Sequence, residues 1–290
     1  MSKETTLPLD GPNADQIAYW NDTAGQTWAS LQSLLDRQIA PLGQAAMAAL
    51  APAPGEAIAD IGCGCGDTVL DLARAVGPDG SVTGLDISGP MLEVARARIA
   101  QAGLKQASVI AADAQTHPFA PASLDAVYSR FGVMFFHQPL AAFANMRTAL
   151  KPGGRLAFVC WRPLAENPWM GVPLQAALKH VPPPPPPADP FQPGPFAFAD
   201  PERLGGILAE AGFGDIDIAP HDQMIGGNDL ERSMLLSQKV GPLGMLLREN
   251  PGKREALVAS LREALEPHVT PDGVLLGSAT WIVTARRAAG

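Results

Sequence analysis

The stretch that decides the fold is AIADIGCGCGDT, which runs from Ala57 to Thr68. An apolar segment that predicts a strand passes through Asp60 into three glycines at alternating positions, and DTVLDLARAV (67–76) then predicts a helix with Asp67 as its N-cap. Glycine lets the backbone approach a ligand closely, and a helix N-terminus offers free N–H groups and a partial positive charge. The stretch therefore predicts a strand, a tight turn and a helix start that suit a carboxylate or a phosphate.

Strands and helices alternate around this stretch. The expected strands lie at 56–61, 81–86, 107–113, 124–130 and 154–161, and the expected helices lie at 67–76, 88–103 and 139–150. This alternation predicts βαβ units and a parallel sheet with helices on both faces. Ligands of such sheets bind beyond the carboxyl ends of the strands, where the strand order reverses.

The flanking segments follow other patterns. Residues 13–50 predict a helix that ends at Pro41. Residues 163–199 predict an irregular insertion with a proline run at 182–187, which forms a stiff loop or, as the alternative, a ligand for a proline-binding module. Beyond it we expect a helix at 200–212 capped by Asp200, strands at 215–222 and 280–287, and helices within 229–266.

Composition limits the class of protein. The 290 residues carry a net charge of −8, which argues against nucleic acid and anionic membranes as partners. The first residues lack the apolar core of a signal peptide, and no run of about 18 apolar residues predicts a membrane span. Three cysteines in a chain of this length suggest a reducing compartment. We expect a cytoplasmic protein that acts on a small molecule and binds no metal.

Acidic residues end the second and third expected strands. Asp86 lies 24 residues after Gly62, where a carboxylate can accept hydrogen bonds from both ribose hydroxyls. Asp113, followed by Ala114, ends the third strand, where a carboxylate can accept a hydrogen bond from an adenine amino group. The glycine turn with Gly62 and Gly64 and these two acids lie on successive strand ends, and together they predict an adenosyl cofactor.

The glycine spacing separates two such cofactors. The dinucleotide fingerprint is G-x-G-x-x-G, whose third glycine lets the helix pack on the strand. Here Asp67 stands at that position and Gly66 comes one residue early. A carboxylate at the helix start would repel a pyrophosphate but could accept a hydrogen bond from the ammonium group of an amino acid. The spacing favours S-adenosylmethionine (SAM) over NAD.

Five successive motifs carry these features: IADIGCGCGDT, VTGLDIS with the following ML, AADAQTHPF, LDAVYSRFGVMFF and LKPGGRLAFVCW. They resemble the motifs of class I SAM-dependent methyltransferases, in the ubiquinone/menaquinone-methyltransferase-like branch of bacterial small-molecule methyltransferases. The resemblance is specific over 56–162 and covers about 12–290. It implies a Rossmann-like, doubly wound α/β fold with a seven-stranded, mostly parallel sheet, whose last strand (280–287) runs antiparallel.

The resemblance also implies a cofactor site. Asp86 would hold the ribose, Ile87 and Met91 would pack on the adenine, and the glycines would contact the methionine part. Ser129 and Arg130 would lie under the sulfonium and the acceptor. The cofactor-binding residues expected on this basis are Trp20, Trp28, Asp60, Gly62, Gly64, Asp86, Ile87, Met91, Asp113, Ala114, Ser129 and Arg130.

The same resemblance implies how one catalytic domain is divided. Residues 1–50 would form a helical lid over the cofactor, and 51–162 would form the SAM-binding core. Residues 163–199 would form the proline-rich insertion, and 200–290 the rest of the core with a helical cap at about 227–270.

Two side chains are candidates for a catalytic general base. His137 follows the fourth expected strand, where relatives tend to carry an acidic or small residue, and Tyr19 lies in the expected lid. Each also has a structural interpretation, as a surface or capping histidine and as a core aromatic residue. Trp161 and Trp169 flank the expected mouth of the site and are candidates for lining the acceptor.

Cys63 and Cys65 could form a metal or redox pair. The turn requires small residues, however, and we interpret both cysteines as substitutes for serine, threonine or alanine.

The expected activity is transfer of a methyl group from SAM to a small, partly apolar molecule by in-line displacement, which leaves S-adenosylhomocysteine (SAH). A non-catalytic SAM-binding module and an NAD-dependent oxidoreductase are the alternatives. The sequence leaves open the acceptor, the methylated atom, the use of a base and whether the protein is a homodimer.

Overall fold

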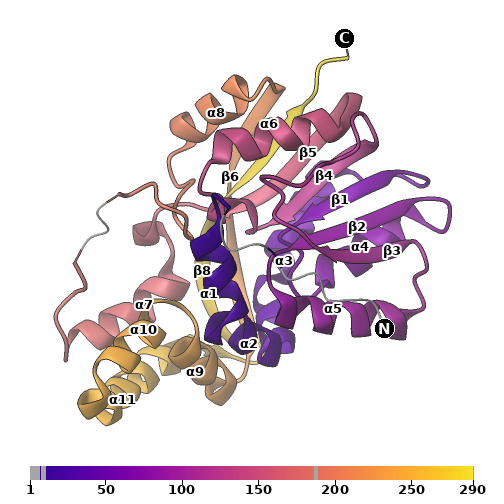
Figure 1. The fold of residues 1–290 in the computed structure, drawn as a ribbon. Coiled ribbons are helices and arrows are strands. Elements are labelled where there is room, and N and C mark those ends of the chain that lie inside the picture. The colour runs from indigo at the N-terminus through magenta and orange to yellow at the C-terminus, as the bar shows by residue number, and fades with distance from the viewer. Residues whose placement is uncertain (1–6, 8–10, 186–188, 290) are drawn as a thin grey trace.

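One mixed sheet forms the centre of the molecule (Figure 1); the computed structural model describes residues 7, 11–185 and 189–289. The strand order is β3-β2-β1-β4-β5-β8-β6. The strands are β1 (Ala57–Ile61), β2 (Ser81–Asp86), β3 (Ala107–Ala111), β4 (Leu124–Arg130), β5 (Leu150–Trp161), β6 (Gly214–Asn228), β7 (Val269–Thr270) and β8 (Gly273–Arg286). β1 to β5 run parallel, and β8 runs antiparallel to both β5 and β6. The expected mostly parallel sheet with an antiparallel last strand is confirmed, and the short β7 adds a pairing to β8.

β1 lies where the strand order reverses. Ile58 pairs with Val82 of β2 on one side and with Ala126 of β4 on the other. The chain that leaves β1 after Ile61 therefore emerges between two strands whose connections lead in opposite directions. This is the place where ligands bind in open α/β sheets.

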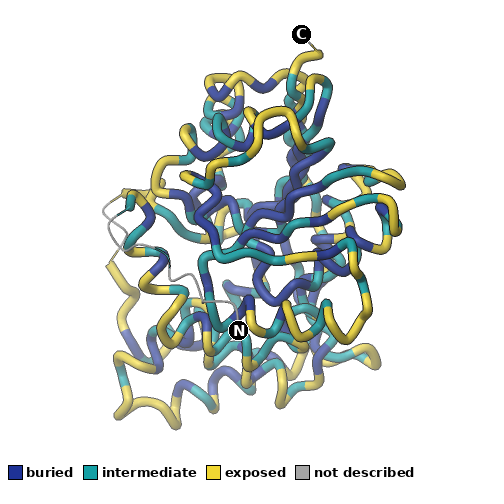
Figure 2. The backbone as a smooth tube through the Cα atoms, turned by 45° about the vertical axis from the view of Figure 1, so that its right-hand side comes forward, coloured by how far each residue is buried: buried dark blue, intermediate teal, exposed yellow. Residues whose placement is uncertain are grey.

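Helices cover both faces of the sheet. α3 (Gln32–Leu50) and α4 (Asp67–Val76) pack together on one face, and α6 (Pro139–Ala149) and α8 (Pro201–Glu210) pack together on the other (Figure 1). α5 (Gly89–Ala102) packs against β3 and α4. Figure 2 shows that buried residues follow the central strands. No helix in the described part of the chain combines the length and the apolar character needed to cross a membrane.

Local sequence accounts for α4. Val69, Leu72 and Val76 recur at helical spacing, and each is fully buried against the sheet. The prediction that Asp67 caps this helix is wrong, because Gly66 occupies the cap position and Asp67 is the first helical residue, with its side chain turned to other partners.

The N-terminal segment forms three helices where one was expected: α1 (Ala14–Asn21), α2 (Thr23–Ser30) and α3. The prediction that Pro41 ends the helix is wrong, because α3 continues through it to Leu50. Proline costs one backbone hydrogen bond in a helix. The turns beyond it bury apolar side chains against the sheet, among them Leu42 and Leu50, and this burial offsets the loss.

A cap with its own apolar core lies where β6 ends and β8 begins (Figure 1). It contains α7 (Pro168–Leu178), α9 (Leu230–Lys239), α10 (Gly241–Glu249) and α11 (Arg254–Leu265). The prediction that 163–199 is irregular is wrong over α7, because Ala177 of this helix is buried in the core of the cap. Residues 182–185 have no regular secondary structure, and the last two prolines of the run lie outside the described residues. Short 3-10 helices lie at Val133–Phe135, Leu164–Glu166, Pro251–Lys253 and Glu266–His268.

Candidate functional site

The glycine turn after β1 has backbone angles that favour glycine. Gly62, Gly64 and Gly66 have φ of 67°, 53° and 80°. Packing adds a second requirement. A Cβ atom on Gly62 would lie 2.5 Å from Cα of Gly132, and one on Gly66 would lie 2.9 Å from Cβ of Ala95. The turn is thus held between the loop after β4 and helix α5.

Asp86, at the end of β2, joins this turn to the start of α5. Its carboxylate accepts a hydrogen bond from the backbone N–H of Gly64 at 2.7 Å and another from that of Ser88 at 2.8 Å. Burial raises the pKa of Asp86, and the backbone hydrogen bonds oppose that rise. Because a carboxylate oxygen has two lone pairs, each oxygen retains capacity to accept a ribose hydroxyl.

Asp113 is buried just after β3, with Ala114 buried beside it. Its Oδ1 accepts hydrogen bonds from Nδ2 of Asn13 and from the backbone N–H of Gln115, both at 2.9 Å. Asn13 is only 3% exposed, and its Oδ1 accepts the backbone N–H of His137 at 2.8 Å. Asn13 therefore joins the N-terminal segment to the loops that carry the expected adenine acid and the candidate base. No sequence pattern had indicated this residue.

Helix α1 is bonded to the loop after β2. The side chain of Asn21 donates to the carbonyl of Ile87 at 2.7 Å and accepts from the backbone N–H of Gly89 at 2.9 Å. The hydroxyl of Ser88 donates to the carbonyl of Trp20 at 2.7 Å. The expected lid thus lies directly against the loop expected to contact the adenosine.

An aromatic cluster lies between α1, α2 and the loop after β4. The ring centroid of Trp20 is 5.3 Å from that of Tyr19 and 5.7 Å from that of Trp28, in edge-to-face geometry. Phe135, which sequence reasoning missed, completes the cluster at 5.4 Å from Trp20. Tyr19 lies at its outer side and is 57% exposed, whereas Met91 on α5 is buried.

Asp60 lies on β1 beneath the glycine turn and is fully buried. Its Oδ2 accepts a hydrogen bond from the hydroxyl of Thr68 at 2.5 Å. Burial raises the pKa of Asp60 to about 7, and the Thr68 hydroxyl and the charge of Arg130 oppose the rise. Its Oδ1 has no hydrogen-bond partner among the described residues. An unpartnered buried acceptor at this position fits a ligand that brings a hydrogen-bond donor, such as the ammonium group of SAM.

Arg130 and Asp67 bind each other at 3.0 Å. The second terminal nitrogen of Arg130 binds Asp36 of α3, so any contact of this residue with the sulfonium would come from its backbone or its methylene groups. Asp67 also binds Arg98. Two guanidinium groups therefore balance its charge, and the sequence argument that Asp67 would repel a pyrophosphate loses force.

The ends of β4 and β5 carry the expected acceptor side of the site. The hydroxyl of Ser129 donates to the carbonyl of Ile61 at 2.7 Å, which ties β4 to the glycine turn. Phe131 has a φ of 63°, an uncommon value for a bulky residue. Its ring stacks on Trp161 at 4.1 Å, and Trp161 contacts Trp169 at 4.8 Å. His137 is exposed at the start of the next loop.

The cysteines are packed inside the protein. Cys63, Cys65 and Cys160 are buried and free. Burial raises the pKa of Cys65 to about 12 and lifts those of Cys63 and Cys160 above their usual range, so the reactive thiolate is disfavoured. Within residues 11–185 and 189–289, no group of three or more His, Cys, Asp or Glu side chains could hold a metal ion.

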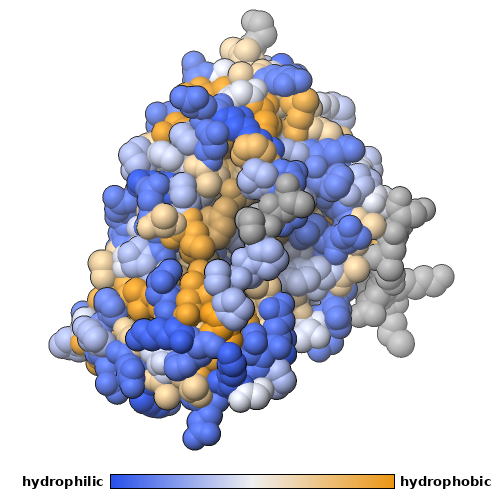
Figure 3. Space-filling model, turned by 90° about the vertical axis from the view of Figure 1, so that its left-hand side faces the viewer, coloured by the Kyte–Doolittle hydropathy of each residue, from blue (hydrophilic) through white to orange (hydrophobic). Residues whose placement is uncertain are grey.

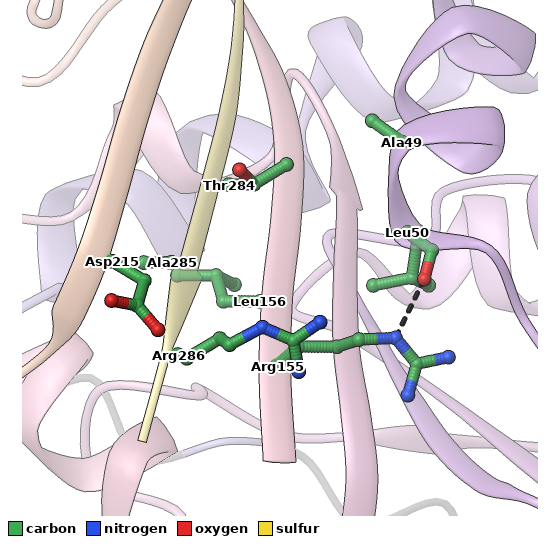
Figure 4. Close-up of a pocket in the computed structure, with 8 residues that line it drawn as sticks. All are labelled: Ala49, Leu50, Arg155, Leu156, Asp215, Thr284, Ala285 and Arg286. Atoms are coloured by element: carbon green, nitrogen blue, oxygen red, sulfur yellow. Dashed lines mark hydrogen bonds between the residues drawn. The ribbon is translucent and has the colours of Figure 1, made fainter. Parts of the chain in front are cut away.

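A small pocket lies between α3, β5 and β8, at the end of the central strands that is away from the glycine turn (Figure 4). Its volume is about 90 Å³, and Arg155 donates to the carbonyl of Leu50 in its wall at 2.6 Å. Small-molecule sites usually measure roughly 300 Å³ or more. Its size and its position therefore indicate that this pocket is not the cofactor site expected at the carboxyl ends of the strands.

A groove of about 480 Å³ lies in the cap, between Pro182–Pro185 and α10.

Comparisons with known proteins agree with this geometry. Residues 58–154 match a family model described as "Methyltransferase domain". O-methyltransferase cnsE of Penicillium expansum is 30% identical over 256 residues, which cover 85% of this chain and 84% of that protein. Aklanonic acid methyltransferase DauC of Streptomyces sp. (strain C5) is 36% identical over 118 residues, 41% of this chain and 54% of that protein. Demethylmenaquinone methyltransferase of Lactococcus lactis is 36% identical over 105 residues, 36% of this chain and 42% of that protein. The chain thus spans about half the length of these last two relatives.

Solved structures share the fold at low sequence identity. A phosphoethanolamine N-methyltransferase 2 of Haemonchus contortus, solved with phosphomonomethylethanolamine and SAH, gives a TM-score of 0.59 at 16% identity, over 97% of this chain and 62% of that chain. YcgJ protein of Bacillus subtilis gives a TM-score of 0.56 at 15% identity, over 86% of this chain and 100% of that chain.

Proposed function

The chain belongs to the class I SAM-dependent methyltransferase family, because it is similar to O-methyltransferase cnsE over most of both chains. We propose that it methylates a small, partly apolar molecule. Bound SAM would supply an electrophilic methyl group, whose bond to sulfur breaks as the bond to the acceptor forms. The task of the protein is then to align the reactants and to exclude water.

The observation that carries this proposal is the arrangement of two carboxylates beside the glycine turn. Asp86 is fixed by two backbone N–H groups, and Asp113 is fixed by Asn13 and Gln115. Asp86 ends β2 and Asp113 follows β3, and both strands lie on the same side of β1. Such fixed acceptors favour binding because little order is lost when a ribose and an adenine amino group arrive.

The N-terminal helices would complete the cofactor site. Asn13 and Asn21 bond α1 and the residue before it to the loops after β3, β4 and β2. We propose that 1–50, of which residue 7 and 11–50 are described, acts as a lid that keeps water from the methyl group. For the rest of the chain we propose the division into a core (51–162), a proline-rich insertion (163–199) and the remainder of the core with its cap (200–290), with α7 of the insertion packed into the core of the cap.

The acceptor would enter at the ends of β4 and β5, beside Phe131, Trp161 and Trp169. Phe131 and Trp161 are buried and stacked on each other and Trp169 is half-buried, so these rings would form an apolar wall beside the acceptor. Figure 3 shows a band of apolar residues on the side of the molecule that carries the 163–199 segment and the cap. This distribution supports a partly apolar acceptor. With the net charge of −8, it also supports a small molecule rather than nucleic acid. We propose a cytoplasmic protein, because Cys63, Cys65 and Cys160 are free, as in a reducing compartment.

A general base is needed only for acceptors that must lose a proton. We propose His137 first and Tyr19 second, because both are exposed near the residues expected to hold the cofactor. Once an acceptor is known, His137→Ala should lower kcat and leave the KM for SAM unchanged. Tyr19→Phe is the matched comparison, since it removes only the hydroxyl.

The test begins with binding and continues with turnover. Calorimetry should detect SAM and SAH binding to the wild-type protein, and a fluorescence titration should detect no NADH binding. An acceptor panel scored by SAH release should then reveal turnover. Binding without turnover on a broad panel would favour a non-catalytic SAM-binding module, and absence of SAM and SAH binding would overturn the proposed function.

A further inference from the structure

Four charged side chains form a closed ring beside the glycine turn. Arg130 bridges Asp36 and Asp67 through its two terminal nitrogens, at 2.9 and 3.0 Å. Arg98 bridges the same two carboxylates, at 3.0 and 2.9 Å. Each carboxylate uses both oxygens and each guanidinium uses both terminal nitrogens, so the charges balance. We call these four residues the charge ring.

The charge ring joins four elements that are distant in the sequence. Asp36 lies on α3, Asp67 on α4, Arg98 on α5 and Arg130 at the end of β4. Their side chains are only 10 to 23% exposed, so water and salt screen them less than they screen surface ion pairs. Paired, charge-assisted hydrogen bonds of this kind also fix geometry.

Further contacts connect the charge ring to the turn itself. Arg98 donates to the backbone carbonyl of Cys65 at 2.9 Å, and Asp67 directly follows the last glycine of the turn. Gly43 makes room for the ring on α3, since a Cβ there would lie 2.7 Å from Cδ of Arg130. The glycine turn is therefore held at two points: at the carbonyl of Cys65 by Arg98, and at Asp67 by both arginines.

We propose that Asp36 and Arg98 are positioning residues for cofactor binding. They act through Cys65 and Asp67 to hold the glycine turn in the shape that receives the methionine part. Asp36 lies one turn beyond the break between α2 and α3 at Leu31, so the charge ring also fixes the base of the N-terminal segment to the turn. This inference rests on the proposed function.

The test measures the SAH dissociation constant by calorimetry together with the melting temperature. Asp36→Asn and Arg98→Gln each leave one charge of the ring unbalanced, and each should weaken SAH binding by about tenfold, the effect of losing one charged hydrogen-bond partner. The double variant keeps the neutral pair of Arg130 and Asp67, so it should bind SAH no more weakly than the weaker single variant. Asp36→Glu should bind more tightly than Asp36→Asn, because it retains a carboxylate.

The matched control is Glu56→Gln. Glu56 directly precedes β1, at the end of this strand away from the glycine turn. It binds Arg155 at 2.7 Å, and both side chains are 18% exposed. This variant should lower the melting temperature and leave the SAH dissociation constant unchanged. Arg98→Lys, a milder change, carries the test if the other single variants do not fold, and it should bind SAH more weakly than the wild type.

Two results would overturn the inference in different ways. If the wild type binds SAH and the folded ring variants bind it equally well while melting earlier, the charge ring only stabilises the fold and the proposed function stands. If the wild type binds neither SAM nor SAH, the proposed function fails and this inference fails with it.

Discussion

Replacing Asp60 by asparagine should remove a pH-dependent loss of stability. Asp60 is fully buried on β1, and burial raises the pKa of its carboxyl group from the usual 3.8 to about 7. One pKa unit corresponds to about 1.4 kcal/mol, so the difference between the folded and unfolded chain is worth about 4 kcal/mol.

The sign follows from proton counting. Between pH 4 and 7, roughly, Asp60 is ionised in the unfolded chain but protonated in the folded protein, so the folded state binds the extra proton. Its contribution to the free energy of unfolding is therefore present at acid pH, decreases as pH rises through this window, and is constant above it. Asp60→Asn has no such group and can still accept the hydrogen bond of the Thr68 hydroxyl with its amide oxygen.

Urea unfolding followed by circular dichroism between about pH 4 and 8 measures this effect. The free energy of unfolding of Asp60→Asn, relative to the wild type, should rise by about 4 kcal/mol across that range. Glu56→Gln is the control of opposite sign, because the hydrogen bond from Arg155 lowers the pKa of Glu56 from its usual 4.5. The contribution of Glu56 is therefore constant over most of this range and is lost only as pH falls below about 4.5. A difference between wild type and Asp60→Asn that stays constant with pH would refute the reasoning.

Three other substitutions test the site. Asp86→Ala removes an acceptor for two ribose hydroxyls, and calorimetry should show SAH binding weakened by about a hundredfold or more; near wild-type affinity would contradict that role. Asn13→Ala removes the hydrogen bonds to Asp113 and to the loop after β4, and stopped-flow measurements should show SAH released about tenfold faster. An unchanged release rate would mean that Asn13 does not help to hold the cofactor. Gly132→Ala places a Cβ 2.7 Å from Cα of Gly62, and thermal unfolding should show a loss of about 1–3 kcal/mol; a stable variant would mean that the two loops separate easily.

Local patterns in the sequence predicted the central elements well. β2, β4 and α4 have the bounds that were expected, because apolar periodicity and flanking glycines act within a few residues. The cap of α8 at Asp200 is confirmed for the same reason, since its carboxylate accepts the N–H groups two and three residues ahead.

Long-range packing decided what the sequence did not predict. Pro41 lies inside α3 because the turns after it bury apolar side chains against the sheet, and this burial stabilises the longer helix. Asn13 meets Asp113 across 100 positions, and Asp36 meets Arg130 across 94, so no periodic pattern marks either pair. Arg98 and Arg130 lie 31 and 63 positions from Asp67, so the sequence argument that Asp67 would repel a pyrophosphate could not include the two charges that balance it.

A crystal structure of the protein with SAH tests the central claim most directly. The account predicts that the ribose hydroxyl oxygens lie roughly 2.5–3.0 Å from the carboxylate of Asp86, with the adenine amino group bonded to Asp113 and the sulfur facing the ends of β4 and β5. SAH bound elsewhere, for example in the cap groove beside Pro182–Pro185, or bound with its ribose away from Asp86, would contradict it.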